Sequence, residues 1–394
     1  MIMISILVVG IVAVLIGALS LSALNTARQE KTSAALAQAK DALLGRAVSD
    51  PNMPGSLPCP DQVTNIVGTN VPDDGIADLL AGNDCPSYIG RLPWKTLGLS
   101  DLRDGYGERL WYALSPAFRD DNSAWPLNSN TKGSLPVYNA DGTTLQTQAG
   151  YDAVAVIFSP GSPVGAQTRN TAAQQNDAAN YLDTANSRNN AISGGPFIAG
   201  VKSSTFNDQL LYITTKDLMP LVERLVAGVV KKALDDYYAA HNYYPWADNI
   251  TSTVSYGSNA GLNRGWLPDD ASTNPGWPDP STPNWQAGSP PQWFFDNQWY
   301  ALIYYSVAKS YTVDSSMCTS CLSFTLFVDG NSGVRALFFM PGTPIGTLTR
   351  AIDNLSDYLE DAENTNDDDV YTSPSSQDRD RDHLYWLPGA TWKP

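Results

Sequence analysis

The chain has 394 residues, more than a single domain of about 100 to 200 residues needs, which leaves room for a membrane segment and two globular units. Hydrophobic residues make up 43% of it and aromatic residues 10%, and this composition excludes a disordered chain. The formal net charge is -16, and no cluster of Lys or Arg is present to neutralise phosphates, which excludes nucleic acid as a partner.

The N-terminal segment predicts a membrane helix. Residues 1–24 contain no charged side chain, and at about 1.5 Å per residue they are long enough as a helix to cross a hydrocarbon core of about 30 Å. No basic residue precedes the apolar run, so an ordinary cleaved secretory signal is not expected. The alternative is an ordinary signal anchor.

We expect this helix to continue to about Arg46. Apolar side chains recur at helical spacing beyond residue 24, while charged residues occupy other faces. These apolar residues are Ala34, Ala35, Ala39, Leu43 and Ala47. The segment 50–55, which contains Pro and Gly, then ends the helix. The sequence thus predicts a rod of about 70 Å, with residues 1–47 as the first structural unit.

Two features of the sequence make opposite predictions about the orientation of the helix in the membrane. The positive-inside rule would place Arg28 and Lys31 in the cytoplasm, whereas paired cysteines favour an oxidising compartment. A short basic leader before Met1, removed during processing, would reconcile the two. We therefore expect the body to lie on the far side of the membrane.

The four cysteines fall into two local pairs, Cys59 with Cys85 and Cys318 with Cys321. We expect both pairs to be disulfides, as in an exported protein. The alternative is one zinc ion held by all four thiolates, but Cys59 and Cys85 are too far apart in the sequence to form the Cys-x-x-Cys pair that is typical of such sites. The spacing of Cys318 and Cys321 also occurs in redox motifs, but the segment that follows alternates like a strand instead of opening a helix.

An internal repeat is the most specific feature of the sequence. The string FSPGSPVGAQTR at 158–169 matches FMPGTPIGTLTR at 339–350, including both Pro, both Gly and the closing Thr-Arg. Further pairs keep the same order along the chain: 43–61 with 234–248, 90–94 with 265–269, 110–115 with 298–303, 180–183 with 357–360, and 208–212 with 382–386. We therefore expect two tandem units, 48–217 and 218–394, the second of which opens with an amphipathic helix at 218–240.

Each unit is expected to contain a helix, a Pro-containing turn, a long irregular loop and then strands. Apolar, β-branched and aromatic runs predict strands; they lie at 111–114, 153–158, 324–328 and 334–339. A helix followed by antiparallel strands belongs to the α+β class.

This architecture resembles that of the type IV pilins and of the pseudopilins of type II secretion. Similar to the start of a mature pilin are Ile4, Leu7, Val8, Val9 and Gly10. The string LDDYYAAHNYYP at 234–245 is similar to the turn that ends a pilin helix. The segments 57–61, 90–99 and 102–112 look like those of large pilin-like proteins of Gram-negative bacteria. The resemblance implies two tandem pilin-like units behind one long N-terminal helix.

By this resemblance the chain is a structural subunit of an extracellular filament. It would sit in the inner membrane with a periplasmic body before assembly, and pack through its N-terminal helix on the cell surface afterwards. The implied partners are copies of itself, other pilins and the pilus or secretion assembly machinery, and no enzyme activity is implied. The residues of the filament core would be Met1, Ile4, Ser5, Leu7, Val8, Val9, Gly10 and Gly17.

One position departs from the family pattern. Typical pilins have Glu at the fifth mature position, where it helps assembly, whereas counting from Met1 gives Ser5. A tip pseudopilin can lack this Glu, so a minor tip subunit of a secretion or pilus system is the first alternative. A surface adhesin and, last, a membrane-anchored periplasmic enzyme are the others.

Residues suited to catalysis or metal binding are few. The two histidines, His241 and His383, stand in no nucleophile, metal or general-base motif. No cofactor is certain, but acidic residues could hold a calcium ion. The candidates are Asp367, Asp368 and Asp369, with Asp73, Asp74 and Asp78 as a second group. A solvated acidic loop is the alternative, because the spacing of an EF-hand is absent.

Tryptophans gather in a Pro-rich stretch in the second half of the chain. They are Trp266, Trp277, Trp285, Trp293 and Trp299. If exposed, these rings could stack on sugars or contact a surface, as in an adhesin. If buried, they would belong to the core of the second unit.

Overall fold

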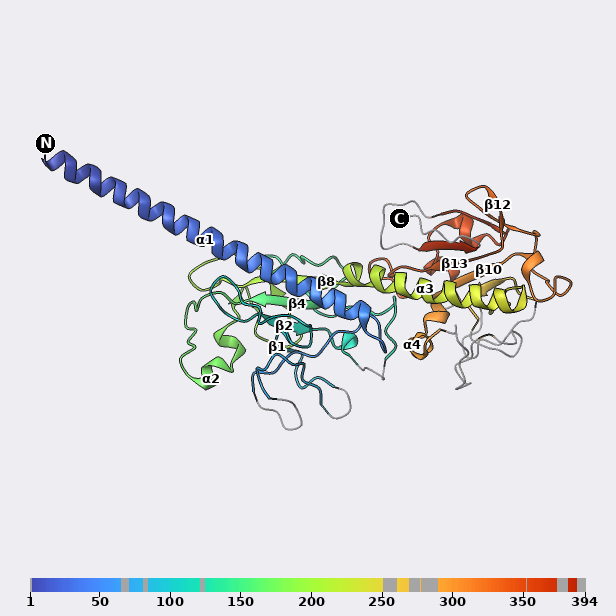
Figure 1. Cartoon of the computed structure of the whole chain (residues 1–394), viewed down its shortest axis with the longest axis horizontal. Coiled ribbons are helices and arrows are strands. Elements are labelled where there is room, and N and C mark those ends of the chain that lie inside the picture. The colour runs from blue at the N-terminus through green and yellow to red at the C-terminus, as the bar shows by residue number, and fades with distance from the viewer. Residues whose placement is uncertain are drawn as a thin grey trace.

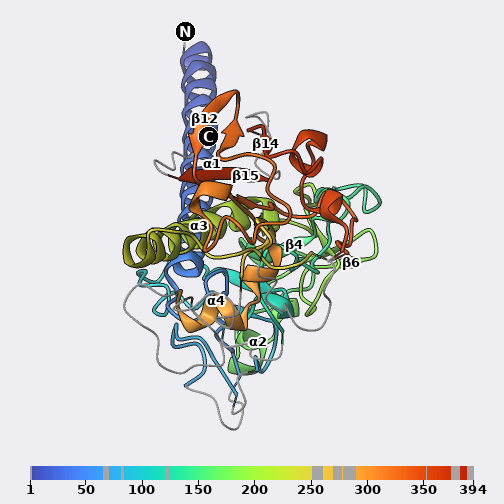
Figure 2. The ribbon, with the colours of Figure 1, turned by 90° about the vertical axis from the view of Figure 1, so that its right-hand side faces the viewer.

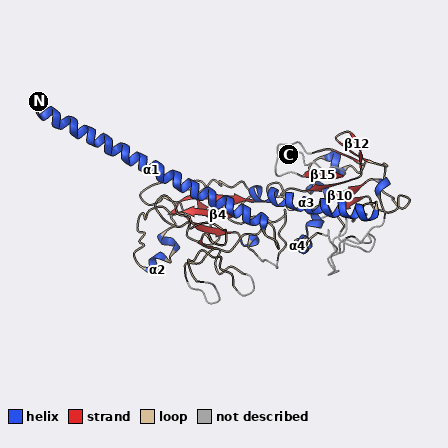
Figure 3. Cartoon of the chain, viewed as in Figure 1, coloured by secondary structure: helices blue, strands red, loops and turns tan. Residues whose placement is uncertain are grey.

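The structure is a computed structural model (Figure 1). It describes residues 2–64, 71–80, 84–120, 125–250, 261–268, 277, 290–351, 353–373 and 382–387, with side chains described from Ser22 onward. Helices and antiparallel sheets both contribute, so the expected α+β class is confirmed. Figure 3 shows two strand-containing bodies placed one after the other, with one long helix projecting from the first.

Helix α1 (Ile2–Ser49) is the continuous rod that the sequence predicts. Its C-terminal half packs on the body through side chains three or four residues apart, the spacing of one helix face. These buried residues are Thr32, Ala35, Leu36, Ala39, Leu43 and Ala47. The expectation that Ala34 shares this face is wrong. Ala34 is exposed, because at about 100° per residue it lies on the far side of the helix from Leu36.

The first unit is built on an antiparallel sheet in the order β1-β2-β4-β8. Its strands are β1 (Ile89–Arg91), β2 (Trp111–Leu114), β4 (Ala153–Ser159) and β8 (Gln209–Thr214). Helix α1 and the start of α3 (Thr215–His241) pack on this sheet. Trp111, Val156 and Phe158 belong to a separate core cluster formed with the loops. Because both faces are covered, β4 is buried at every position.

The second unit repeats this arrangement. Its sheet has the order β9-β10-β13-β15 and is again antiparallel throughout. The strands are β9 (Arg264–Trp266), β10 (Tyr304–Val307), β13 (Ala336–Met340) and β15 (His383–Leu387). In chain order they are the counterparts of β1, β2, β4 and β8, so the topology agrees with a tandem duplication.

The register of the central strands corrects one alignment between the two halves. The similar Trp-Tyr-Ala-Leu strings predict that Trp299–Leu302 is the counterpart of β2, but this segment is the short 3-10 helix η3. Trp111 pairs with Phe158, and Tyr304 pairs with Phe339. Since the two phenylalanines open the matching loops, β10 is the true counterpart of β2. The similar strings give the wrong alignment because the position of a strand in a sheet depends on its pairing with the neighbouring strand and on which side chains are buried.

A glycine in each unit lets a strand pass close to the segment that follows the helix. The backbones of Asp61 and Asp248 exchange hydrogen bonds of 2.7 to 3.0 Å with β1 and β9, respectively. A Cβ on Gly90 would lie 2.5 Å from the carbonyl oxygen of Asp61, and one on Gly265 would lie 1.9 Å from that of Asp248. Any larger residue at either position would therefore force the two segments apart.

Helix α3 joins the two units without a linker. It begins directly after β8, where Thr214 and Asp217 form a capping box, and it ends at Asn242 in the left-handed conformation. The boundary expected at 217/218 therefore falls inside this helix. Its first turns pack on α1 and β8, and near its end Tyr237 packs edge-on against Trp277 of the second unit.

The remaining elements lie in the connections. In the first unit they are η1 (Pro116–Phe118), β3 (Val137–Tyr138), α2 (Ala172–Gln175), η2 (Ala178–Asn180), β5 (Thr184–Ala185), β6 (Arg188–Asn189) and β7 (Phe197–Ile198). In the second they are α4 (Gln292–Asp296), η4 (Lys309–Tyr311), β11 (Leu326–Val328), β12 (Asn331–Val334), η5 (Leu355–Asp357), η6 (Ala362–Thr365) and β14 (Val370–Tyr371). The strand expected at 324–328 thus begins at Leu326, and the run expected at 334–339 is divided between β12 and β13.

Candidate functional site

The N-terminal half of α1 projects from the body, and its attachment begins near Arg28. The guanidinium of Arg28 lies 4.9 Å from the centre of the Tyr106 ring. The Thr32 hydroxyl accepts a hydrogen bond of 3.0 Å from the N–H of Gly105. Side chains 22–27 are exposed, and the helix before them stands clear of the body in Figure 1, while Figure 2 shows its N-terminal end extending past the body.

The side chains expected to form a filament core lie outside the described part of the chain. They are those of Met1, Ile4, Ser5, Leu7, Val8, Val9, Gly10 and Gly17. Among the residues that the structure describes in full, no helix combines the length and apolarity needed to cross a membrane. For the segment before Ser22, the structure gives the helical backbone from Ile2 and its direction away from the body.

Ion pairs fix the direction of α1 on the body. Lys40 lies 3.3 Å from the carboxylate of Asp217, which ties α1 to the start of α3. At the end of α1, Arg46 pairs with Asp50 at 2.5 Å and with Asp120 at 3.1 Å. Burial disfavours the charged form of Asp50, but hydrogen bonds from backbone N–H groups and from Arg46 outweigh burial and lower its pKa. The rod is therefore held on the first unit by charge as well as by packing.

Both expected cysteine pairs are disulfides. Cys59 and Cys85 are bonded in the first unit, with Cα atoms 5.4 Å apart, and both are buried. Cys318 and Cys321 are bonded in the second unit, with Cα atoms 5.7 Å apart. No cysteine is left free, so the alternative of a four-cysteine zinc site is wrong.

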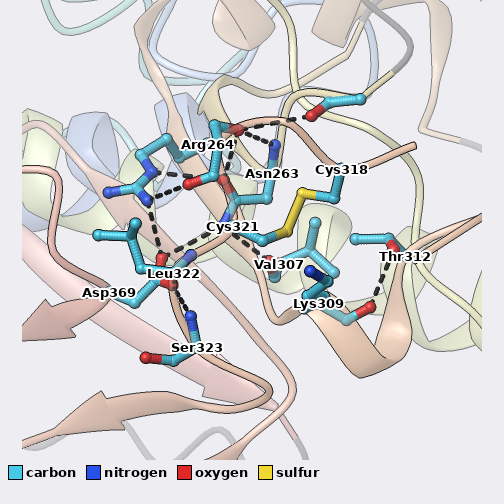
Figure 4. Close-up of a disulfide and its surroundings, with 12 residues drawn as sticks. Asn263, Arg264, Val307, Lys309, Thr312, Cys318, Cys321, Leu322, Ser323 and Asp369 are labelled. Carbon is cyan, nitrogen blue, oxygen red and sulfur yellow. Dashed lines mark hydrogen bonds and ion pairs between the residues drawn. A yellow bond between two sulfur atoms is a disulfide. The ribbon is translucent and has the colours of Figure 1, made fainter. Parts of the chain in front are cut away.

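A buried ion pair holds the loop that the second disulfide closes (Figure 4). Asp369 is fully buried, and its carboxylate lies 3.1 Å from the guanidinium of Arg264. The same carboxylate accepts hydrogen bonds of 2.9 and 2.8 Å from the backbone N–H groups of Leu322 and Ser323. A buried charge needs such a complete set of partners. Asp369 is therefore a structural anchor for this loop.

The acidic run at 367–369 is not assembled as the calcium site that the sequence suggests. Besides the anchoring role of Asp369, Asp368 accepts a hydrogen bond of 2.9 Å from the N–H of Val370. Asp367 lies 3.6 Å from the guanidinium of Arg264. All three carboxylates are thus engaged by N–H or guanidinium donors.

The second calcium candidate has similar partners. Asp73 pairs with Arg109 at 2.8 Å, while Asp74 and Asp78 accept hydrogen bonds of 2.8 and 2.7 Å from backbone N–H groups. Across the described residues, no group of three or more His, Cys, Asp or Glu side chains is placed to hold a metal ion. The expectation of calcium is therefore unsupported at both places.

An arginine closes the repeated loop of the first unit. Arg169 donates from Nε to the carbonyl of Asn180 at 2.8 Å and from Nη1 to the carbonyl of Gly161 at 3.0 Å. Its guanidinium carbon lies 4.2 Å from the centre of the Tyr181 ring. The arginine thereby satisfies carbonyl groups that a Pro- and Gly-rich loop leaves without partners.

Arg350 makes the equivalent contacts in the second unit. It donates from Nε to the carbonyl of Asp357 and from Nη1 to the carbonyl of Gly342, both at 2.9 Å. Its guanidinium carbon lies 5.0 Å from the centre of the Tyr358 ring. The sequence match between the loops thus has a structural cause, which the sequence alone did not reveal.

A pair of neighbouring carboxyl groups follows each repeated loop; Asp183, Asp208 and Asp382 are buried, and Glu360 is half-buried. In the first unit, the N–H of Asp183 donates to the carboxyl group of Asp208 at 2.7 Å, and burial followed by the charge of Asp183 raises the pKa of Asp208. In the second unit Asp382 lies beside Glu360. Burial, then the hydrogen bond and charge of Glu360, raise the pKa of Asp382 to about 9. Since two adjacent acids do not both ionise readily, the pair of Asp382 and Glu360 retains a proton near neutral pH, and the pKa of Asp208 is shifted in the same direction.

The two units meet across a polar seam in which amide side chains form the bridges. The side-chain oxygen of Asn297 accepts a hydrogen bond of 2.8 Å from the N–H of Leu127, and its carbonyl accepts one of 2.7 Å from Asn128. Arg350 also donates to the side chain of Asn130 at 3.1 Å. Asn297 and Asn128 are buried. These bonds fix the relative position of the two units at the seam.

The tryptophans of the Pro-rich stretch do not form an exposed surface. Of these, Trp266, Trp277, Trp293 and Trp299 are at most 8% exposed, while Trp285 lies outside the described residues. The rings fill the core of the second unit; the Trp266 ring centre, for example, lies 4.8 Å from that of Tyr358. The expectation of an adhesive surface is therefore wrong for the described members of this group.

The two histidines lie in structural surroundings. His241 stands at the end of α3, with its ring centre 4.4 Å from that of Tyr237. His383 opens β15, where burial lowers its pKa, and it lies 4.0 Å from the carboxylate of Glu223. Both histidines thus contact groups of the fold itself: an aromatic ring for His241 and a carboxylate for His383.

Comparison of the chain with known protein families, with curated proteins and with solved structures finds no match. Its function is therefore inferred from the projecting helix, the disulfides and the duplicated body.

Proposed function

We propose that the chain is a structural subunit of an extracellular filament of the type IV pilin or pseudopilin kind, with α1 as its assembly element. The observation that carries this proposal is the division of α1 into two halves. The C-terminal half is packed on the first sheet, whereas the N-terminal half projects from the body (Figure 1). The projecting half includes residues 1–24, which carry no charge.

Association of such helices would have a clear driving force once they leave the bilayer. Each Val, Leu or Ile side chain that is removed from water contributes about 1.5 to 3 kcal/mol. Small residues let helix backbones approach closely, and Gly10, Ala13, Gly17 and Ala18 supply them here. A few neighbours around each helix would therefore hold a subunit in place.

In this proposal the chain is anchored in the inner membrane, with its body in the periplasm, before assembly. After assembly it is part of a filament on the cell surface. The two disulfides are consistent with an oxidising compartment. Its partners are copies of itself or other pilins in the filament, together with the assembly machinery in the membrane.

A matched pair of variants tests the proposal. Leu7→Arg places a charge in the apolar stretch, and Ala173→Arg places the same charge on an exposed position of α2. We expect only Leu7→Arg to remove the chain from filaments sheared off the cell surface. Fractionation of the same cells separates failed membrane insertion from failed assembly. Equal filament content in the two variants would contradict the proposal.

The shape of the molecule favours a second candidate, a minor subunit at the filament tip. The second unit lies beyond the C-terminal end of α1 along the longest axis (Figure 1). In a filament of parallel α1 helices, the second unit would occupy the place of the next subunit along the filament. Ser5 at the position of the usual Glu is consistent with this role. Quantitative mass spectrometry distinguishes the candidates, because a tip subunit is present once per filament and a major subunit throughout.

A further inference from the structure

We propose that the groove at the seam between the two units binds a neutral carbohydrate, with Trp125 as the stacking platform. The inference is independent of the filament proposal, since it concerns the body alone. The groove has a volume of about 460 Å³ and is lined by both units. Small-molecule sites commonly have this size and commonly lie between domains.

Trp125 is 71% exposed and lines the groove. It differs in this from every other tryptophan that the structure describes, since those are buried or half-buried. A large aromatic side chain held in water beside a groove is an unusual use of apolar surface. The flat indole face suits the C–H face of a pyranose ring, and its N–H suits a sugar hydroxyl.

Gln298 lies across the groove on the second unit and supplies a polar group. It is exposed, and its carboxamide has no hydrogen-bond partner among the described residues. Its backbone is left-handed, with φ of 56°, a conformation that costs a non-glycine residue about 1 kcal/mol or more. One carboxamide offers both a donor and an acceptor, the combination that two neighbouring hydroxyl groups require.

The charge of the groove favours a neutral ligand over an anion. Arg350 is the one charged residue among the lining residues. Its guanidinium already donates to the carbonyls of Asp357, Gly342 and Pro341 and to the side chain of Asn130. Little hydrogen-bonding capacity remains to hold a phosphate or a carboxylate.

The site is formed before any ligand arrives. Asn297, next to Gln298, is buried and bonded to both Leu127 and Asn128 of the first unit. The N–H of Gln298 donates to the carbonyl of Phe295 at 2.8 Å. Because the two walls are joined in this way, binding would require little reorganisation.

The test uses the full chain in mild detergent, titrated with glucose, galactose, N-acetylglucosamine and lactose and, as a charged probe, glucuronate. Binding is followed by calorimetry for the wild type, Trp125→Ala, Gln298→Gly and a control, Phe324→Ala. Glycine preserves the left-handed backbone at 298, and Phe324 is similarly exposed, at 72%, but does not line the groove.

We expect at least one neutral sugar to bind, and Trp125→Ala to weaken this binding by about tenfold or more, which corresponds to about 1.4 kcal/mol. Gln298→Gly should weaken it several-fold, and Phe324→Ala should leave it unchanged. Thermal melting of each variant checks that the fold is intact. Failure of every neutral sugar to bind, binding of glucuronate alone, or equal affinities of Trp125→Ala and the wild type would overturn the inference.

Discussion

Replacing Asp382 with Asn should flatten the dependence of stability on pH and stabilise the protein at neutral pH. Asp382 is 2% exposed and lies beside Glu360. Burial, followed by the hydrogen bond and charge of Glu360, raises its pKa from 3.8 to about 9. Asparagine has a similar shape but carries no proton to lose.

The sign of the effect follows from where the proton is held. Between pH 3.8 and about 9 the folded protein keeps the proton, whereas the unfolded chain releases it. The stability that the proton provides is complete below pH 3.8 and is lost as the pH rises towards 9. One proton changes the free energy of unfolding by up to about 1.4 kcal/mol per pH unit, or up to about 2.7 kcal/mol between about pH 5.5 and 7.5. The sharing of the proton with Glu360 makes this an upper value.

Urea unfolding of the full chain at a series of pH values measures the effect. Asp141→Asn is the control, because Asp141 is fully exposed and its pKa is lowered, to about 2, first by a hydrogen bond from the Thr144 hydroxyl. Between about pH 5 and 8, we expect the slope of the free energy of unfolding against pH to differ between Asp382→Asn and the wild type by the contribution of about one proton. Asp141→Asn should keep the wild-type slope in this range. Parallel curves for the wild type and Asp382→Asn would refute the reasoning.

Three further predictions concern stability and are checked by urea or thermal unfolding. Cys59→Ala should lower the free energy of unfolding by about 2 to 4 kcal/mol through loss of the bond to Cys85; unchanged melting would count against it. Gly265→Ala should destabilise by about 1 to 3 kcal/mol or more, because the new Cβ would lie 1.9 Å from the Asp248 carbonyl. Gly228→Ala, inside α3 and with nothing within 4 Å of the new Cβ, should instead stabilise by up to about 1 kcal/mol; equal effects of the two glycine replacements would contradict the packing described.

Features encoded locally could be predicted from the sequence. The buried face of α1 follows from helical spacing, as Ala39 and Leu43 show. The close pairs of cysteines indicate their own partners. The matching loops at 158–169 and 339–350 reveal the duplication, because each loop needs the same Pro, Gly and Arg to satisfy its own backbone.

Features that depend on distant contacts could not be predicted in this way. Asp369 looks like part of a solvated or metal-binding run, but it is buried because Arg264, distant in the sequence, folds against it. Trp299 looks like a strand residue, but its segment is a 3-10 helix because the strand register places Tyr304 opposite Phe339. The groove beside Trp125 exists only once the two units have met.

Cryo-electron microscopy of filaments sheared from native cells, with mass spectrometry of the same preparation, tests the filament proposal most directly. We expect helical filaments that contain this chain, with α1 buried between its neighbours, parallel to the filament axis, and the duplicated body outside. If the filaments lack this chain and it is recovered only as single molecules in the membrane, the proposal is contradicted.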